Sequence, residues 1–281
     1  ISSGVIIFQF FSLFKSKKTP KVETLFSDAL NALLNGDKLK AMSLLKQVVK
    51  KDTNHVRAYL QLGNILRKEN PDRAIKIHQS LTVRPNLSLD QKVQIHKSLA
   101  KDYIEIGYLK KATEEAKKIL LIEKRNLWSL NFLVKTSEQN QNWEEAAIWS
   151  KHLQKVSGKK EVNDLSRFDI YKGLDCMRNG KIEDAKSFFK IAIKKSPDNG
   201  QAYKYLGDLY EKNRDLVKAL ENWQIYATKD KKSGIDVYHK IESALFDLGR
   251  YSEVEKFYKK LISLNKSNLE AVIKLANVLE E

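Results

Sequence analysis

One helix-forming pattern recurs along this chain with a period of about 34 residues, and this recurrence limits the possible folds more than any other feature. The copy at residues 59–81 is the clearest. Its apolar residues are spaced three and four apart, so they form one face on each of two short helices. A turn at residues 70–72 joins the two. A hairpin of this size cannot bury its apolar faces alone, so it requires neighbours of the same kind. The sequence therefore predicts stacked helical hairpins.

Seven copies of the hairpin follow one another from Val22, and the first helix of an eighth begins at Leu269. Small residues recur in the second helix, where they let the paired helix approach closely: Ala41, Ala112, Ala146, Ala185 and Ala219. Glycines recur at the turn, where a positive φ ends the first helix: Gly36, Gly107, Gly180 and Gly249. These two sets of small residues predict tight helix pairs with sharp turns between them.

The sixth copy shows the spacing that is typical of the tetratricopeptide repeat, with Leu206-Gly207, Tyr210 and Ala219. We therefore expect an all-α fold in which residues 22–281 form a tetratricopeptide-repeat array. This array is expected to be a right-handed superhelical solenoid of seven full repeats and one helix of an eighth.

Composition agrees with a folded helical protein. The chain is 42% hydrophobic and 31% charged, with 11 glycines and 4 prolines, which favours helix over disorder. The net charge of +16 is compatible with a nucleic-acid or membrane partner, but only nine of the 51 basic residues are arginine. Lysines interleaved with acidic residues, as at residues 110–118, suit a solvated helix surface. We expect no nucleic-acid partner.

The N-terminal residues differ from the rest. An apolar run ending at residue 14 is shorter than the ~20 residues that a membrane helix needs, and lysines follow at once. A secretory signal would have its charges first, and a buried core helix is the other alternative. We interpret residues 1–14 as the C-terminal part of a transmembrane helix and residues 15–21 as a basic juxtamembrane linker, which places the array in the cytoplasm. Because the chain starts at Ile1 and its eighth repeat is half complete, we expect a fragment truncated at both ends.

No motif of catalytic chemistry is found. The chain has no glycine-rich phosphate loop, Gly-x-Ser-x-Gly elbow or His-Glu-x-x-His sequence. Cys176 is the single cysteine, so no disulfide or paired-cysteine zinc site exists within the chain. We expect His78 to be a packing or capping residue, and Glu114 and Glu115 to be solvated charges. The sequence thus predicts a non-enzyme without catalytic, cofactor or metal residues.

The remaining candidate site is a surface. In such arrays the first helices line a concave groove, and stepping through their outward positions gives a mixed cationic and apolar set. The set comprises Arg57, Leu60, Asn64, Arg67, Lys97, Lys101, Trp128, Lys135, Arg167 and Lys204. This mixture suits an extended or helical peptide with acidic and apolar residues. The alternative is that most of these side chains are only solvated.

Part of the sequence resembles one known family. Leu62-Gly63-Asn64, the run at 72–75 and Ile77-His78-Gln79 resemble the second repeat of the lipopolysaccharide assembly protein B family, and the likeness continues through residues 88–108. The resemblance implies a single-pass protein of the bacterial inner membrane with a cytoplasmic repeat array. It implies an adaptor that brings a membrane AAA+ metalloprotease to the deacetylase of the lipid A pathway, and so regulates lipopolysaccharide synthesis.

The same family has a rubredoxin-like cysteine module after its repeats, so an iron or zinc site is expected beyond Glu281 in the full-length protein. Two other hypotheses remain. The chain is a generic tetratricopeptide scaffold for another envelope or pilus assembly, or it is the substrate-binding arm of an enzyme whose catalytic domain is missing.

Overall fold

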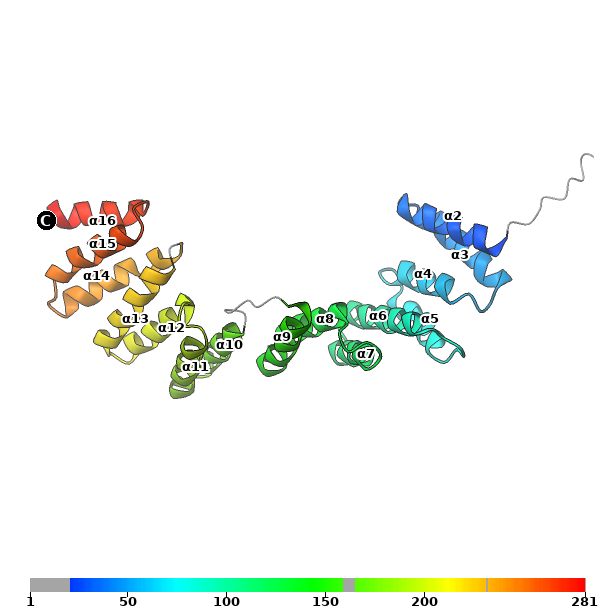
Figure 1. Cartoon of the computed structure of the whole chain (residues 1–281), viewed down its shortest axis with the longest axis horizontal. Helices are drawn as coiled ribbons and strands as arrows, with labels where there is room; N and C mark the ends of the chain where they lie inside the picture. The colour runs from blue at the N-terminus through cyan, green and yellow to red at the C-terminus, as the bar shows by residue number, and fades with distance from the viewer. Residues whose placement is uncertain (1–20, 159–164, 231, 281) are drawn as a thin grey trace, which may run out of the picture. The chain divides into compact units, whose positions relative to one another are not determined.

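A computed structural model describes residues 21–158, 165–230 and 232–280. These residues form fifteen α-helices and one short 3-10 helix, and no strand occurs among them. Figure 1 shows the helices following one another in chain order. The predicted all-α fold is confirmed. The handedness of the superhelix stays a prediction.

The chain divides into two compact units, Ile1–Ser129 and Leu130–Glu281. The first unit contains three helix pairs and the start of α8. Its helices are α2 (Val22–Leu34), α3 (Lys38–Lys51), α4 (Val56–Leu66), α5 (Pro71–Thr82), α6 (Leu89–Glu105) and α7 (Leu109–Ile122), with α8 (Leu127–Gln139) continuing into the second unit.

The second unit continues the same order of helices. It contains α9 (Trp143–Ser157), α10 (Ser166–Arg178), α11 (Ile182–Lys195), α12 (Gly200–Lys212), α13 (Leu216–Lys229), the 3-10 helix η1 (Gly234–Val237), α14 (Tyr238–Asp247), α15 (Ser252–Leu264) and α16 (Leu269–Glu280). The α-helices of both units thus fall in order into seven successive pairs and a final single helix, as the repeat count predicts.

Helix ends follow from local sequence. Gly36, Gly107, Gly180 and Gly249 have φ values of +77°, +76°, +71° and +67° at the turns within pairs, which confirms their predicted role. At the α4–α5 turn, a capping side chain takes the place of a glycine with positive φ. There the side chain of Asn70 caps α5 and accepts a hydrogen bond from the backbone N–H of Arg73, and proline occupies the first turn.

Small residues hold the two helices of a pair close together. The five alanines predicted at the second-helix position are all fully buried. A Cβ added to Gly63 would lie 2.3 Å from Nε2 of His78, and one added to Gly173 would lie 2.4 Å from the ring of Phe189. At these positions a larger side chain would displace its neighbour, so the close approach of the helices depends on the absence of a side chain.

Among the helices of the described ranges, none is both long and apolar enough to cross a membrane. The predicted transmembrane segment, residues 1–14, and nearly all of the predicted linker lie outside those ranges.

Candidate functional site

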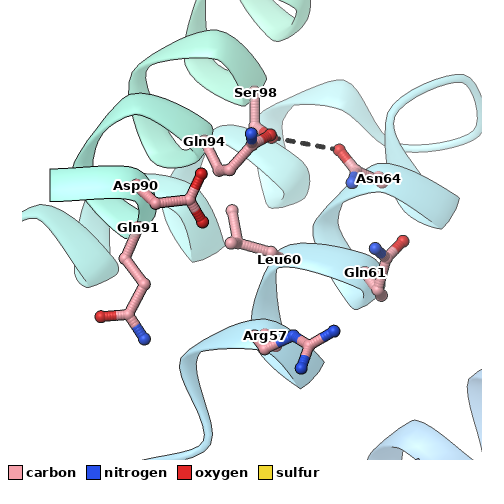
Figure 2. Close-up of a pocket in the computed structure, with 8 residues that line it drawn as sticks. All are labelled: Arg57, Leu60, Gln61, Asn64, Asp90, Gln91, Gln94 and Ser98. Carbon is pink, nitrogen blue, oxygen red and sulfur yellow. Dashed lines mark hydrogen bonds between the residues drawn. The ribbon is translucent and has the colours of Figure 1, made fainter. Parts of the chain in front are cut away.

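A hollow of about 260 Å³ lies between α4 and α6, the first helices of the second and third repeats. Its lining residues recur every three or four positions, so each helix presents one face to it. They are Arg57, Leu60, Gln61 and Asn64 from α4 and Asp90, Gln91, Gln94 and Ser98 from α6. Figure 2 shows these side chains arranged around Leu60. We call this hollow the α4–α6 groove.

The α4–α6 groove has an apolar floor and a polar wall. Leu60 is buried, and the other lining side chains are amides, a hydroxyl, one guanidinium and one carboxylate. The carboxylate is that of Asp90, which Figure 2 shows pointing into the hollow. Amide side chains both donate and accept hydrogen bonds, as the main chain of a peptide requires. The groove therefore suits a polypeptide better than an apolar small molecule.

The side chain of Asn64 is held in one orientation. Its Oδ1 accepts hydrogen bonds from Nη2 of Arg67 at 2.6 Å and from Oγ of Ser98 at 3.3 Å, the second of which is drawn in Figure 2. Both partners are donors, so the oxygen faces them and the Nδ2 amide group faces away. Within the part of the chain that the structure describes, Nδ2 has no partner. Asn64 thus presents a fixed pair of N–H donors.

Behind Asn64 lies a buried polar network. Nε of Arg67 donates to Oδ1 of Asp102 at 2.6 Å, and the other carboxylate oxygen lies 2.5 Å from Nδ1 of His78. Nε2 of His78 lies 3.2 Å from the carbonyl oxygen of Leu60 in the paired repeat helix. His78 and Asp102 are fully buried, and each uses its polar atoms within the protein. His78 is therefore a packing residue, as predicted, and it also anchors the network that orients Asn64.

Three further predicted residues continue from the groove. Lys97 and Lys101 lie on the α6 face that carries Gln94 and Ser98, and Nζ of Lys97 is 5.0 Å from the centre of the half-buried ring of Trp128. Burial, followed by the charges of Lys97 and Arg67, lowers the pKa of Lys101. The first unit therefore brings together seven of the predicted residues, from Arg57 to Trp128, on the first helices of consecutive repeats.

Three other predicted residues belong to the second unit. Lys135 is exposed on α8. Arg167 forms an ion pair with Glu138, with 2.7 Å between Nη2 and Oε1. Lys204 forms an ion pair with Asp236, with 3.0 Å between Nζ and Oδ2. Partial burial acts to lower the pKa of Lys204, but the hydrogen bond to that carboxylate raises it overall. Two of these three cations are thus already paired within the chain.

The prediction for Glu115 was wrong. Glu114 is exposed as expected, but Glu115 is buried and accepts from Nδ1 of His96 at 2.6 Å and Nζ of Lys118 at 2.7 Å. Burial acts to raise the pKa of Glu115, but these hydrogen bonds lower it overall. Neighbouring helix residues do point in different directions, as argued from the sequence. Glu115 is the one that points inward, towards α6, where its carboxylate accepts a hydrogen bond from His96.

Sequence reasoning also missed Asp102 and Ser98. Both are buried on α6, and Asp102 sits among apolar residues beside Leu99 and Tyr103. A carboxylate on an apolar helix face needs a partner, because an unpaired buried charge is costly. This signal is present in the sequence and points to an internal ion pair.

No group of three or more metal-binding side chains occurs in the residues that the structure places. Cys176 is half-buried and packs against the apolar cluster around Phe189. A rubredoxin-like site requires paired cysteines, and the sequence has one cysteine. The residues present therefore do not fit such a metal site.

Stacked helix pairs with small residues at their contacts and a polar groove on the first helices make the described residues an all-helical, tetratricopeptide-like solenoid. Residues 172–229 match the tetratricopeptide repeat family. In structure, the chain is similar to one in the solved Naa15/Naa10 complex bound to HypK-THB, with 16% identity and a TM-score of 0.50 over 93% of this chain and 39% of that one. This likeness concerns the fold alone.

The sequence is similar to lipopolysaccharide assembly protein B. It is 23% identical to the protein of Escherichia coli K12 over 252 residues, which cover 89% of this chain and 64% of that protein. It is 26% identical to the Haemophilus influenzae protein over 212 residues, which cover 69% of this chain and 52% of that protein. The resemblance indicated by residues 62–81 and 88–108 is confirmed, and the 252 aligned residues extend well beyond them. The chain spans less than two thirds of the length of these relatives.

Proposed function

We propose that this chain is the repeat-bearing part of a membrane-tethered adaptor that assembles other proteins and regulates lipopolysaccharide synthesis. The observation that supports it most is the similarity to lipopolysaccharide assembly protein B over 89% of the chain. In this proposal the protein crosses the bacterial inner membrane once, and its repeats face the cytoplasm. Its action is to couple a membrane AAA+ protease to the deacetylase of the lipid A pathway, without catalysing a reaction itself.

The chemistry of the α4–α6 groove supports binding rather than catalysis. The buried histidine of the network, His78, has both ring nitrogens next to acceptors inside the protein, so neither reaches a ligand. Asp102 shares its two carboxylate oxygens between His78 and Arg67. The polar lining of the groove is mostly amides, together with the guanidinium of Arg57 and the carboxylate of Asp90, and such groups recognise a polypeptide by hydrogen bonds and charge.

Affinity capture tests this proposal. The full-length protein, tagged at its C-terminus, is expressed in its own host, and complexes are purified from detergent-solubilised membranes. Mass spectrometry should recover the AAA+ protease and the deacetylase. The matched control is a strain that carries the same tag on an unrelated single-pass membrane protein. Recovery of neither enzyme above this control, or a full-length protein found entirely outside the membrane fraction, refutes the proposal.

A further inference from the structure

The second helix of the first repeat, α3, carries a different charge pattern from the other second helices. Its fourteen residues include five lysines and no aspartate or glutamate. Each of the other second helices in the described ranges carries at least one acidic residue, namely α5, α7, α9, α11, α13 and α15. A surface that serves solubility alone mixes both signs of charge, as those helices do. The unmixed positive charge of α3 therefore indicates an anionic partner.

One face of α3 combines lysines with apolar side chains. Its residues follow one another at helical spacing and line a shallow depression along the helix: Leu39, Met42, Ser43, Lys46, Gln47 and Lys50. We call this surface the α3 face. Leu39 is 81% exposed on it. The opposite side of the helix is buried through Ala41, Leu45 and Val48, so the α3 face is the side that remains open to a partner.

The positive charge of the α3 face is not neutralised within the described parts of the chain. Lys46 and Lys50 form no ion pair there. The nearest acids in the sequence, Asp37 and Asp52, flank the helix, and the carboxylate of each accepts a hydrogen bond from a backbone N–H group. The two lysines are therefore available to an anion from outside the chain.

The α3 face also lies close to the point where the proposed function places the membrane. In that proposal residues 1–14 cross the bilayer, and residues 15–21 span at most about 25 Å before α2 begins. Figure 1 shows α2 and α3 as a hairpin, so α3 ends beside the start of α2. Lys46 and Lys50 lie towards that end of α3. Their distance from the bilayer is thus limited by a short linker.

We propose that the α3 face rests on the membrane surface and binds the headgroups of anionic phospholipids. The ammonium groups of Lys46 and Lys50 contact lipid phosphates, and Leu39 and Met42 enter the boundary between headgroups and acyl chains. This second contact fixes the orientation of the first repeat relative to the bilayer, which a single tether leaves variable. The inference rests on the proposed function, since it requires a chain that is tethered to a membrane.

An anionic bilayer fits the α3 face better than a nucleic acid does. The exposed side chain of Leu39 gains free energy when it is buried at the edge of the acyl chains, whereas a phosphate backbone offers it no apolar contact. All the basic residues of α3 are lysines. Lysine is a compact point charge that suits a single lipid phosphate, and it lacks the planar fork with which arginine recognises bases.

The test measures whether the α3 face touches lipid. Ser43 is exposed on the face, so the fluorophore NBD is attached at Ser43→Cys in a Cys176→Ala background, which removes the single native cysteine. The labelled chain is reconstituted into vesicles of phosphatidylethanolamine with phosphatidylglycerol, and into vesicles of phosphatidylcholine alone. The matched control probe is attached at Ser263→Cys, which is exposed on α15, a second helix that carries acidic residues.

We expect the emission of NBD at position 43 to shift to shorter wavelength on vesicles that contain phosphatidylglycerol, and to be quenched there by lipids with a nitroxide headgroup. Both changes should diminish on phosphatidylcholine alone and as salt rises, because the attraction is electrostatic. Neither change should occur at position 263. A probe at position 43 that stays in water on both kinds of vesicle, or equal changes at the two positions, overturns the proposal.

Charge variants test the two lysines directly. Lys46→Gln with Lys50→Gln should lower the ratio of lipid-bound to water-exposed probe at position 43 at least about tenfold, since each lysine near an anionic surface contributes about fivefold. The control pair on α15, Lys256→Gln with Lys260→Gln, removes the same charge at the same spacing and should leave this ratio unchanged. Circular dichroism at 222 nm must show wild-type helix content for each variant. Equal effects of the two pairs overturn the proposal.

Further outcomes separate this inference from the proposed function. A chain that floats with the vesicles while the probe at position 43 stays in water keeps the tether and overturns the contact of the α3 face. Lipid contact at position 43, with no protease or deacetylase captured from membranes, supports the α3 face and refutes the named partners. Transfer RNA that causes the same shift in detergent, without phospholipid, overturns the choice of a lipid surface.

Discussion

Replacing Gly63 by alanine tests whether the contact between α4 and α5 controls the buried network. A Cβ at this position would lie 2.3, 2.5 and 2.9 Å from three atoms of the His78 ring. Contacts this short are not tolerated, so the ring must move. The ring is fully buried and is held on one side by Asp102 and on the other by the carbonyl of Leu60. Its displacement therefore breaks hydrogen bonds as well as packing.

The expected change in the free energy of unfolding combines three effects. Overpacking a tight core site costs about 1–3 kcal/mol. Loss of one hydrogen bond to a carboxylate costs a further ~1.5 kcal/mol. Alanine is favoured over glycine within a helix by about 1 kcal/mol, which acts in the opposite direction. We expect Gly63→Ala to lower the free energy of unfolding by about 2–3 kcal/mol.

The assay is equilibrium unfolding in urea, followed by circular dichroism at 222 nm. Because repeat arrays can open locally, hydrogen exchange at the amides of α4 and α5 should show where protection is lost. The control is the same substitution in a His78→Ala background. There the ring is absent, so Gly63→Ala should become stabilising by up to ~1 kcal/mol, which is its helix propensity alone.

This reversal of sign is the sharpest part of the prediction. A Gly63→Ala variant as stable as the wild type would refute the reasoning, since the ring would then have room to move at no cost. Equal destabilisation in the wild-type and His78→Ala backgrounds would also refute it, because the clash would have to involve something other than the ring.

Three other perturbations follow from the structure. Arg67→Met leaves Asp102 buried without its guanidinium partner and should lower the free energy of unfolding by about 3 kcal/mol in urea titrations; a loss below ~1 kcal/mol would show that the pair is dispensable. Glu115 has a lowered pKa in the folded state, so its contribution to stability is present above about pH 4.3 and is lost as pH falls through the folded pKa. Glu115→Gln should therefore flatten the decline in the urea midpoint between about pH 4.5 and 3, and an unchanged profile would contradict this. Gly249→Ala places a Cβ at φ +67° in open space and should cost about 1–2 kcal/mol through backbone strain alone, measured as a lower thermal midpoint; a higher midpoint would contradict it.

The features that the sequence predicted well are local. The positive φ at Gly36 and the full burial of Ala41 depend on residues in the same hairpin, so the spacing of small residues was sufficient to predict them. The order of helix pairs could be predicted for the same reason. In a repeat array each hairpin meets its neighbours in the same way, so one well-recognised hairpin predicts its copies.

The candidate site could be predicted only in part. Sequence positions alone placed Arg57, Leu60 and Asn64 in a groove, and the α4–α6 groove contains all three. They did not distinguish Lys204, which is paired with a carboxylate, from Lys101, which forms no ion pair within the described residues. Both occupy outward positions on first helices. The difference depends on whether an acidic residue about 32 positions away faces the lysine, and helical spacing does not encode that.

The sequence by itself determined the architecture of this protein, because hydrophobic spacing and small residues act within one hairpin and its immediate neighbours. Only the tertiary structure decided which polar side chains are paired inside the protein and which face the α4–α6 groove. Asp102 meets His78 across 24 residues and Arg67 across 35, on helices of different pairs. The contacts between pairs therefore fix the orientation of Asn64, since the donors to its oxygen come from Arg67, held by Asp102, and from Ser98 on the neighbouring repeat.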